Sequence, residues 1–356
     1  MRILTIIGAR PQFIKHAILQ KKLADYGIEE ILLHTGQHFD FAMSEVFFQE
    51  LEMRKPQILL EIKERESLLQ LGSMLIQMHQ RLKSENFDCV VVYGDTTTTL
   101  AGSLFAKERG VKLVHIEAGL RSGDLTMPEE RNRIMSDQIS DLLFAPTLGA
   151  YENLLREDVK GKAFISGDVM LDSFLHFSFR AQKPQGVEIP RDFILCTLHR
   201  QSNVDDMERL RVLLQGLGEV GKKIPILLPL HPRTQRRLKE FCISLPSSIC
   251  LLPPQGYLQT LWLLKHCVYV FTDSGGLQKE AYFAKKKCLV LREVSEWKEL
   301  VESGACELLG QRTIDQAFEA LGAFEVLPNL YGEGDSVRKI LRVLKEELGA
   351  ECIDIK

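Results

Sequence analysis

The chain has 356 residues, which is too long for one ordinary α/β domain and sufficient for two. Its apolar fraction of 45% and charged fraction of 26% are typical of globular proteins with buried cores. A net charge of −3 argues against a nucleic-acid or membrane-surface protein, because both classes carry a basic surface. No apolar run approaches the roughly 18 residues that a membrane-spanning helix requires.

The cysteines and the N-terminus indicate the compartment. The eight cysteines are scattered and form no Cys-x-x-Cys pair, so we expect neither a metal site nor a disulfide framework. The first residues, MRILTIIGARP, lack a small-residue cleavage site and are interpreted as a buried strand rather than a signal peptide. We therefore expect a reduced, cytoplasmic protein.

Short β-branched runs alternate along the chain with longer stretches of helical periodicity. In the first half, the predicted strands are residues 3–8, 30–36, 89–95, 112–119 and 142–147. Residues 176–191 contain two prolines and a glycine without periodicity, which is typical of a linker. The alternation then resumes with predicted strands at residues 193–199, 224–231, 249–254, 268–274 and 287–293.

Continuous apolar strands separated by helices indicate parallel sheets that are covered on both faces. We therefore predict an α/β protein with two doubly wound, Rossmann-like domains facing a cleft. The N-terminal domain is expected to span residues 1–175 and the C-terminal domain residues 192–356. The last helices of the chain could pack back on the N-terminal domain.

Polar side chains recur where the predicted strands end. Ligands of open α/β sheets bind beyond the carboxyl ends of the strands, so these positions together indicate a site in the cleft. A polar residue at any single strand end could simply be exposed to solvent. The strand ends carry Arg10 followed by Lys15, then Asp95, Glu117, His199, His231, and Ser274-Gly275-Gly276.

The stretch VFTDSGGLQKEAYF passes from a predicted strand into a predicted helix at Gly275 and Gly276. The backbone N–H groups and the helix dipole at such a junction favour a phosphate, and Ser274 adds a hydroxyl. Glu280 lies about one turn into the helix and could accept hydrogen bonds from ribose hydroxyls. The alternative is a turn that uses glycine only for its backbone freedom.

The turn after the first strand, GARPQF, is not a Gly-x-Gly-x-x-Gly motif, and no P-loop motif occurs in the chain. The bulky Arg-Pro-Gln sequence would keep a dinucleotide pyrophosphate at a distance, so no nicotinamide cofactor is expected. Arg10 and Lys15 are more consistent with a cationic clamp on a distal phosphate or leaving group.

Several groups could transfer protons, and each also has a structural interpretation. Asp95 could cap the helix that opens at Thr96. Glu129 and Glu130 follow Pro128 in the first turn of a predicted helix, where the helix dipole stabilises negative charge. His199 could be a satisfied polar residue at a strand end. The candidates for proton transfer are Asp95, Glu117, Glu129 or Glu130, and His199.

From residue 8 to about 300, a series of motifs resembles the non-hydrolysing UDP-N-acetylglucosamine 2-epimerases. The resemblance implies the two-domain glycosyltransferase B-type fold, a homodimer, and conversion of UDP-GlcNAc to UDP-ManNAc without NAD. It also implies that UDP leaves C1 as the C2 proton is removed, and adds back to a 2-acetamidoglucal intermediate. The motifs are GARPQFIKHA, TGQHFD, YGDTTTTLAG, HIEAGLRSGD, MPEERNRIMSDQISDLLFAPT, GDVMLDSF, TLHRQSN, PLHPRT, PPQGYLQTLWLL and TDSGGLQKEA.

The resemblance assigns a role to each motif residue, with the sugar on the N-terminal domain and UDP on the C-terminal domain. It implies that the catalytic residues are Asp95, Glu117, Glu129 and His199. It implies that Arg10 and Lys15 bind substrate and phosphate, Ser274, Gly275 and Gly276 bind the diphosphate, Glu280 binds the ribose, and Gln255 contacts the uracil side. It implies no metal and no cofactor.

The GARPQFIK, TLHR and SEW variants are similar to the branch that acts on UDP-2,3-diacetamido-2,3-dideoxyglucuronic acid. The sequence therefore leaves two sugars open, and either product would feed surface-polysaccharide synthesis. The alternatives are a hydrolysing 2-epimerase, a glycosyltransferase of the same fold, and a non-catalytic nucleotide-sugar binder.

Overall fold

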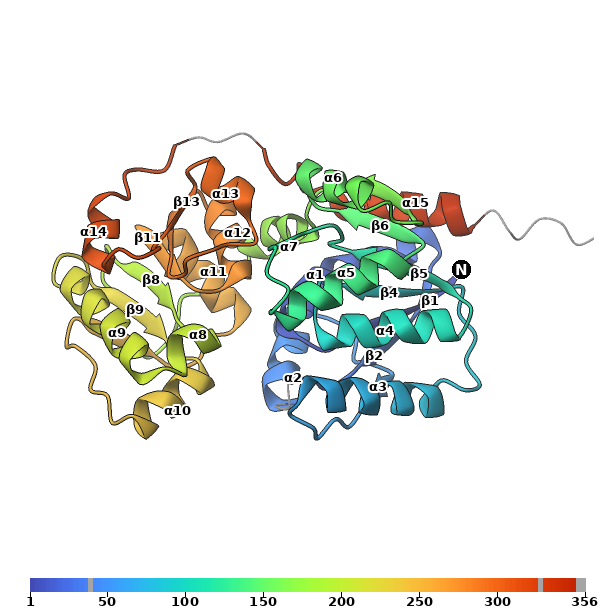
Figure 1. Cartoon of the computed structure of the whole chain (residues 1–356), viewed down its shortest axis with the longest axis horizontal. Helices are drawn as coiled ribbons and strands as arrows, with labels where there is room; N and C mark the ends of the chain where they lie inside the picture. Colours follow the sequence, from blue (N-terminus) through green and yellow to red (C-terminus); the bar gives the residue numbers. More distant parts are fainter. Residues whose placement is uncertain (38–40, 326–328, 350–356) are drawn as a thin grey trace, which may run out of the picture. The chain divides into compact units, whose positions relative to one another are not determined.

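A computed structural model of the chain describes residues 1–37, 41–325 and 329–349. Residues 38–40 of the TGQHFD motif and Cys352 lie outside the described residues. The chain divides into two compact units, of which one is Met1–His176 with Asn329–Lys356 and the other is Phe177–Pro328 (Figure 1). Residues 176–191, the predicted linker, begin inside a helix that ends at Ser178 and continue as turns and loops.

The first unit is built on a parallel sheet whose strand order, over the described residues, is β3-β2-β1-β4-β5-β6-β7. Leu4 of β1 is in register with Ile31 of β2 on one side and with Val90 of β4 on the other. The strands are β1 (Arg2–Ile7), β2 (Glu29–His34), β3 (Ile58–Leu59), β4 (Cys89–Tyr93), β5 (Lys112–Ile116), β6 (Leu142–Ala145) and β7 (Lys162–Ile165).

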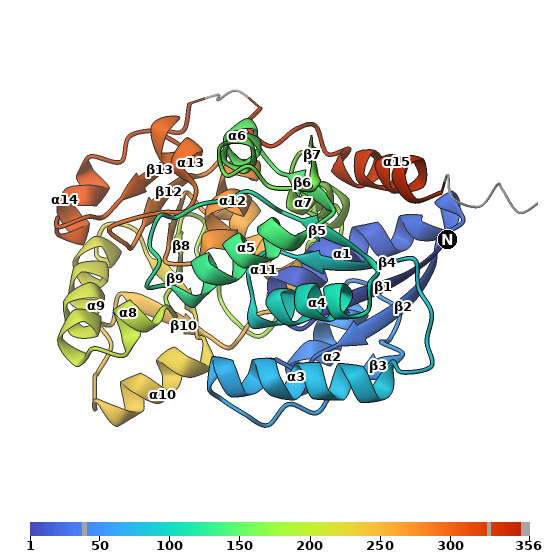
Figure 2. The same ribbon diagram turned by 45° about the vertical axis from the view of Figure 1, so that its right-hand side comes forward.

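Helices cover both faces of this sheet, and α3, α4 and α5 pack side by side over one of them (Figures 1 and 2). The closing helix α15 packs against α1. Asp172 accepts hydrogen bonds from the backbone N–H groups of Ser336 and Val337, at 3.2 and 3.0 Å, and so caps α15. The helices are α1 (Arg10–Leu23), the short 3₁₀ helix η1 (Ala24–Tyr26), α2 (Phe41–Glu50), α3 (Ser67–Arg81), α4 (Thr97–Glu108), α5 (Pro128–Ile139), α6 (Leu148–Arg156), α7 (Val169–Ser178) and α15 (Ser336–Leu348).

The second unit repeats the plan with a parallel sheet of order β10-β9-β8-β11-β12-β13 over the described residues. Its strands are β8 (Ile194–Thr197), β9 (Ile226–Pro229), β10 (Ile249–Leu252), β11 (Tyr269–Thr272), β12 (Lys287–Val290) and β13 (Cys306–Leu308). Its helices are α8 (Gln201–Val204), α9 (Met207–Gly221), α10 (Pro232–Glu240), α11 (Tyr257–His266), α12 (Gly275–Phe283), α13 (Lys298–Glu302) and α14 (Ile314–Glu319). A core of buried aliphatic side chains from β8, β9 and α9 fills the space beneath the helices.

The ten predicted strands are confirmed, and within residues 1–37, 41–325 and 329–349 the structure has three further strands that were not predicted. The missed strands β3, β7 and β13 lie at sheet edges and are short and incompletely buried, so they lack the continuous apolar run that marks a central strand. Most of the predicted strands also extend too far at their C-terminal ends. Residues such as Gly94 and Asp95 have already left the sheet, which is why they can form a site.

Glu30 of β2 is a buried carboxylate inside the first unit. It accepts hydrogen bonds from Thr5, Gln20 and Arg54 and contacts His16 Nε2 at 3.1 Å. Burial alone would raise the pKa of this carboxyl group, but His16 and the hydrogen bonds outweigh burial and lower the pKa from 4.5 to about 2. The ionised carboxylate therefore stabilises the folded protein.

We expect Glu30→Gln to flatten the acid limb of the stability curve. Because the folded pKa lies below the unfolded value of 4.5, the stabilisation is complete above pH 4.5 and is lost as the pH falls toward 2. Its full size is on the order of 3 kcal/mol. Urea unfolding between pH 6 and 3 measures the difference, with Glu29→Gln on the exposed side of the same strand as the control. Parallel pH profiles for Glu30→Gln and the wild type would contradict this expectation.

Candidate active site

Each sheet has one point at which the strand order reverses direction. In the first unit this point lies between β1 and β4, and in the second it lies between β8 and β11. Ligands of doubly wound sheets bind beyond the carboxyl ends of the strands at such points. The four loops that follow these strands carry Arg10, Asp95, His199 and Ser274. These four residues therefore lie just beyond the strands that flank the two reversal points.

Lys15 and Glu117 form a buried ion pair beyond β1 and β5. The Lys15 ammonium contacts Glu117 Oε1, and the two side chains are almost completely buried. Glu117 has a φ of +70°, a left-handed conformation that is rare for a residue with a side chain. A Cβ atom on the neighbouring Gly94 would lie 3.2 Å from Glu117 Oε1, and the φ of +65° at Gly94 would strain any other residue there. Backbone strain of this kind is concentrated at functional sites.

Asp95 forms an ion pair with Arg133 of α5, and its backbone carbonyl accepts a hydrogen bond from Asn132 Nδ2 at 3.1 Å. The interpretation of Asp95 as a helix cap is wrong. Thr96 is the N-cap of α4, and its side-chain oxygen accepts the hydrogen bond from the Thr99 N–H. Since Asp95 is about 29% exposed, its carboxylate is accessible while Arg133 fixes its position.

The two adjacent acids at the start of α5 have different surroundings. Glu130 is buried, accepts hydrogen bonds from the Ser122 and Gly123 N–H groups at 3.0 and 2.9 Å, and pairs with Arg133 at 2.5 Å. Burial raises the pKa of Glu130, but the hydrogen bonds and Arg133 outweigh burial, so its pKa lies below its ordinary value. Glu129 is half-buried and forms no hydrogen bond or ion pair with the described residues. Glu130 is therefore held by contacts inside the first unit, whereas Glu129 has no such contact with the residues that the structure describes.

A buried network behind these acids was not found from the sequence. His115 of β5 lies 2.7 Å from the Gly94 carbonyl through Nε2 and 2.7 Å from Asp137 through Nδ1. Asp137 also accepts hydrogen bonds from the Gly119 N–H at 3.0 Å and from Arg121 at 2.7 Å. Burial raises the pKa of Asp137, but His115 and Arg121 outweigh it and leave the pKa low.

This network connects α5 to the two loops that carry the acids, because Gly94 precedes Asp95 and Gly119 follows Glu117. The signal in the sequence was His115 within the apolar run KLVHI. A histidine in a strand buried on both faces requires hydrogen-bond partners.

In the second unit, Asp273 organises the loop that carries His199. Asp273 is fully buried and accepts hydrogen bonds from the backbone N–H groups of His199 and Arg200, both at 2.9 Å, and from Asn203 Nδ2 at 3.2 Å. His199 Nδ1 faces Asp273 Oδ1 at 3.4 Å, and its ring stacks on His231 with centroids 5.1 Å apart. A carboxylate that contacts one ring nitrogen fixes the orientation of the imidazole and leaves the other nitrogen able to bind or transfer a proton.

The Ser274-Gly275-Gly276 sequence forms the N-terminus of α12, with Ser274 as the N-cap. Neither glycine has a positive φ, so the alternative that these glycines serve only to give a turn its backbone freedom is wrong. A Cβ atom at Gly275 would lie 2.2 Å from Glu296 Oε1, so a larger residue would have to displace that carboxylate. Arg292 holds Glu296 at 2.8 Å, and Arg200 lies 3.6 Å from it.

The remaining predicted residues are also placed. Arg10 is the exposed first residue of α1, with its guanidinium 4.8 Å from the centre of the Phe47 ring. Gln255 lies in the loop between β10 and α11 and donates a hydrogen bond to the Pro253 carbonyl at 2.7 Å. Glu280 is buried within α12.

The predicted residues therefore fall into two sets, one in each unit. The first unit holds Arg10, Lys15, Asp95, Glu117 and Glu129, and the second holds His199, Gln255, Ser274, Gly275, Gly276 and Glu280. Ion pairs join Lys15 to Glu117 and Asp95 to Arg133, whereas Glu129 contacts no cation within the described part of the chain.

A family model described as UDP-N-acetylglucosamine 2-epimerase matches residues 21–345. The chain belongs to this family. The predicted family, the enzyme class and the two-domain α/β fold of the glycosyltransferase B type are confirmed.

Relatives of this epimerase chain match over nearly their whole length. A UDP-2,3-diacetamido-2,3-dideoxy-D-glucuronate 2-epimerase from Pseudomonas aeruginosa is 44% identical, over 97% of this chain and 99% of the relative. A UDP-N-acetylglucosamine 2-epimerase from Methanocaldococcus jannaschii is 39% identical, over 97% of this chain and 99% of the relative. The crystal structure of the M. jannaschii UDP-GlcNAc 2-epimerase in complex with UDP-GlcNAc and UDP superposes with a TM-score of 0.91, covering 97% of this chain and 100% of that one at 38% identity.

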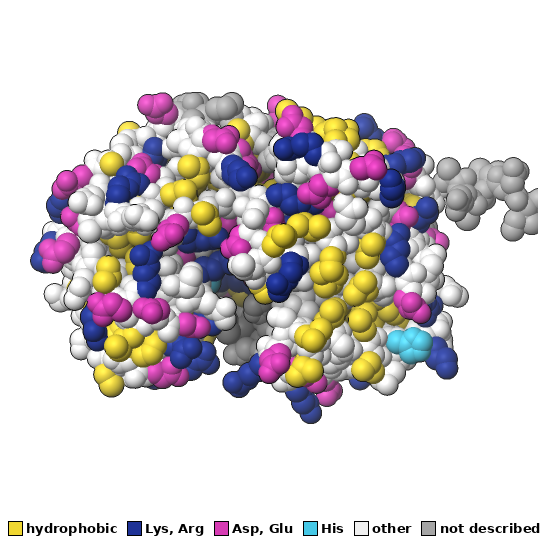
Figure 3. All heavy atoms as spheres, viewed as in Figure 1, with side chains coloured by type: hydrophobic (Ala, Val, Ile, Leu, Met, Phe, Trp, Pro, Cys, Tyr) yellow, Lys and Arg dark blue, Asp and Glu magenta, His cyan; other side chains and the backbone are white. Residues whose placement is uncertain are grey.

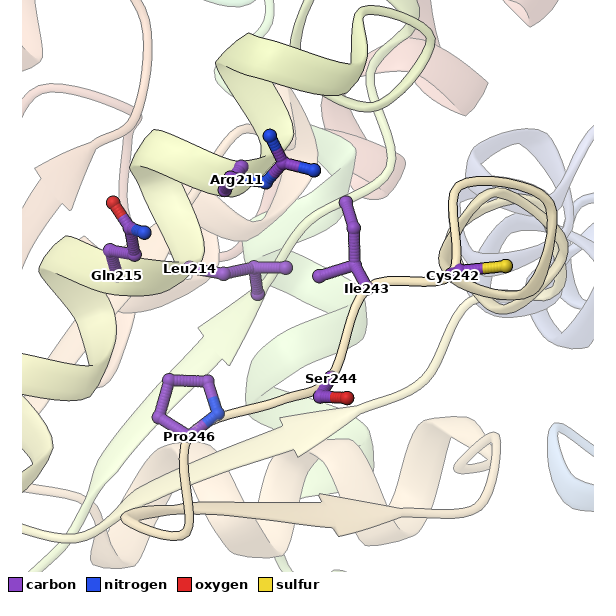
Figure 4. Close-up of a pocket in the computed structure, with 7 residues that line it drawn as sticks. All are labelled: Arg211, Leu214, Gln215, Cys242, Ile243, Ser244 and Pro246. Carbon is purple, nitrogen blue, oxygen red and sulfur yellow. The ribbon is translucent and has the colours of Figure 1, made fainter.

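Metal sites, membrane-spanning helices and cavities are the other features by which this epimerase chain could bind a ligand or a membrane, apart from the two sets of predicted site residues. Within the described residues, no cluster of three or more His, Cys, Asp or Glu residues has the geometry of a metal site, and no helix is long and apolar enough to cross a membrane. A cavity of about 180 Å³ lies between α9 and the segment after α10, where Leu214 and Ile243 point toward each other (Figure 4). It contains none of the predicted site residues.

Proposed function

We propose that this chain is a non-hydrolysing 2-epimerase that inverts C2 of a UDP-activated 2-acetamido sugar by eliminating UDP and adding it back to a 2-acetamidoglucal intermediate. The observation that carries this proposal is the set of acids beyond the first sheet, Asp95, Glu117 and Glu129, in a chain of this family. A site that only binds an anionic nucleotide sugar has little use for three acids.

The chemistry explains why both acids and cations are needed. A C2 proton beside a masked aldehyde is barely acidic, so cleavage of the C1–O bond must run ahead and place positive charge on the ring. Carboxylates stabilise that charge, and cations stabilise the departing diphosphate. Removing a proton from one face of C2 and returning it to the other requires more than one acid or base.

The three acids have different surroundings, as expected if they remove and return the proton at different steps. Glu117 contacts Lys15 and Asp95 contacts Arg133, whereas Glu129 contacts no cation among the described residues. Groups of the same chemical type in different electrostatic surroundings can hold a proton at different stages of one reaction.

We assign the nucleotide to the residues of the second unit. The N-terminus of α12, with Ser274, Gly275 and Gly276, would hold the diphosphate, because helix N-termini attract anions. Glu280 would bind the ribose and Gln255 the uracil, while His199 would act at the diphosphate side under the control of Asp273. Arg10 and Lys15 would bind the leaving phosphate from the first unit.

The preferred sugar is the 2,3-diacetamido-glucuronate, on the strength of the 44% identical relative. The assay compares UDP-GlcNAc with its 3-acetamido uronate analogue and follows both epimers by NMR. Formation of the C2 epimer with UDP still attached is the expected result. Free sugar and UDP would instead indicate a hydrolysing epimerase, and transfer to an acceptor would indicate a glycosyltransferase. Binding without turnover would indicate a sensor.

We further propose that the enzyme works in the cytoplasm as a homodimer and supplies polysaccharide synthesis. Nucleotide sugars are the activated precursors of surface polysaccharides, and the family resemblance implies the dimer.

Glu280→Ala is expected to weaken UDP binding by about 10- to 100-fold, because a hydrogen bond to a charged group contributes roughly 1.5–3 kcal/mol. Isothermal titration calorimetry with UDP measures the change. Glu302→Ala on the exposed side of α13 is the matched control and should bind UDP normally. An unchanged Kd in a folded Glu280→Ala variant would remove this residue from the ribose site.

A further inference from the structure

The two loops that carry Asp95 and Glu117 have a left-handed backbone at three positions. Gly94 has a φ of +65°, Glu117 of +70° and Gly119 of +83°. A residue with a side chain rarely adopts this conformation, so Glu117 keeps it only while its neighbours hold the backbone in place. The Glu117 N–H donates to the Phe144 carbonyl at 3.1 Å, which holds the loop on the side of the sheet. The positions of both acids therefore depend on what else fixes these loops.

One buried side chain holds each loop from the side of α5. Because a carbonyl oxygen can only accept, His115 Nε2 donates the hydrogen bond to the Gly94 carbonyl at 2.7 Å. Asp137 Oδ2 accepts a hydrogen bond from the Gly119 N–H at 3.0 Å. His115 Nδ1 and Asp137 Oδ1 lie 2.7 Å apart. The pair therefore connects the loop after β4 to the loop after β5.

The pair is itself fixed and cannot reach a substrate. Arg121 donates to Asp137 Oδ2 at 2.7 Å and forms two hydrogen bonds with Glu157, at 2.7 and 2.6 Å. Charged side chains are spread over the face shown in Figure 3, whereas His115 and Asp137 are fully buried. A buried network whose members are all hydrogen-bonded is rigid. Any effect of this pair on a reaction must therefore act through the two loops.

We propose that His115 and Asp137 are positioning residues for the reaction at C2. By fixing the backbone of the two loops, they place Asp95 and Glu117 at the sugar ring. This proposal rests on the proposed function, in which these two acids act at C2. A displacement of about 1 Å can lower a rate about 100-fold, so the loss of either hydrogen bond to the loops should be visible in kcat.

The test measures kcat and the Kd for UDP in variants of the full chain. Asp137→Ala removes the acceptor of the Gly119 N–H, and His115→Asn is too short to reach the Gly94 carbonyl. Both should lower kcat about 10- to 100-fold with little change in the Kd for UDP. His115→Gln places an amide N–H near the position of Nε2 and should recover most of the lost turnover. Urea unfolding checks that each variant is folded, and His115→Asn carries the test if Asp137→Ala fails to fold.

Glu30→Ala is the matched control. It also removes a buried carboxylate that contacts a histidine in the first unit, since Glu30 lies 3.1 Å from His16 Nε2. The side chains that donate hydrogen bonds to Glu30 are Thr5, Gln20 and Arg54, and none of them belongs to the loops after β4 and β5. We expect Glu30→Ala to lose stability but to keep its kcat.

Amide hydrogen exchange at Gly119, followed by mass spectrometry, gives a reading that does not depend on activity. Exchange should be faster than in the wild type for Asp137→Ala and unchanged for Glu30→Ala.

A wild-type kcat in folded Asp137→Ala or His115→Asn would overturn the proposal. So would a rise in the Kd for UDP that matches the loss of kcat, no recovery in His115→Gln, or an equal loss of kcat in Glu30→Ala. A wild type that forms no C2 epimer would instead contradict the proposed function. Exchange at Gly119 would then decide whether the pair holds the loop.

Discussion

Asp95→Asn is expected to lower kcat on the order of 10³-fold, the effect typical of removing a group that transfers a proton or stabilises charge. Asparagine has the same shape as aspartate but carries neither the negative charge nor a titratable proton. Arg133 keeps its partner Glu130 at 2.5 Å, so the loop and α5 should remain folded. The residues assigned to the uracil, the ribose and the α12 diphosphate site lie in the other unit, and Asp95→Asn changes neither Arg10 nor Lys15, so UDP binding should remain nearly unchanged. Steady-state kinetics and calorimetry with UDP measure the two quantities.

Asp141→Asn is the control for this variant. Asp141 also pairs with cations, Lys107 and Lys112, but it precedes β6 and therefore lies at the amino-terminal edge of the same sheet. Near-wild-type turnover by Asp95→Asn would contradict its catalytic assignment. An equal loss in both variants would show that the effect comes from destabilisation.

Asp273→Asn is expected to weaken UDP binding by about 10- to 100-fold and to lower the free energy of unfolding by about 2–4 kcal/mol, because buried donors lose their acceptor. The carboxylate accepts hydrogen bonds from His199, Arg200 and Asn203, and an amide cannot satisfy all three. Loss of these bonds would release the loop that holds His199. Calorimetry with UDP and urea unfolding measure the two effects.

Asp205→Asn separates this effect from the general loss of an ion pair. Asp205 pairs with Arg233 and Arg237 in the same unit but is about 29% exposed. The hydrogen bonds from Arg233 and Arg237 hold the pKa of Asp205 at about 2, so Asp205→Asn should also lower the free energy of unfolding, whereas UDP affinity should change little. If Asp273→Asn binds UDP as tightly as the wild type, Asp273 does not control the His199 loop.

Much of the fold could be predicted because the central strands are apolar over their whole length and alternate with helices. The edge strand β7, with the sequence KAFI, could not be recognised, because edge strands are only partly buried and carry a weak pattern. The strand ends that carry Arg10, Asp95, His199 and Ser274 were predictable from the same alternation.

The contacts that organise the site could not be predicted, because they join residues far apart in the sequence. Arg133 lies 38 residues beyond Asp95, and Asp273 lies 74 residues beyond His199. Glu129 and Glu130 are equivalent in the sequence, yet successive helical residues point about 100° apart. That rotation directs Glu130 to the Ser122 and Gly123 N–H groups and leaves Glu129 on another side of α5.

Hydrogen exchange at C2 is the most direct test of an elimination that removes and returns the proton. The UDP-sugar is incubated with the enzyme in D₂O, and both epimers are recovered and examined by NMR and mass spectrometry. We expect one deuterium at C2 of the product epimer and, at equilibrium, of both UDP-sugars, with no other carbon labelled. A C2 epimer formed with its original hydrogen still at C2 would contradict the proposed reaction.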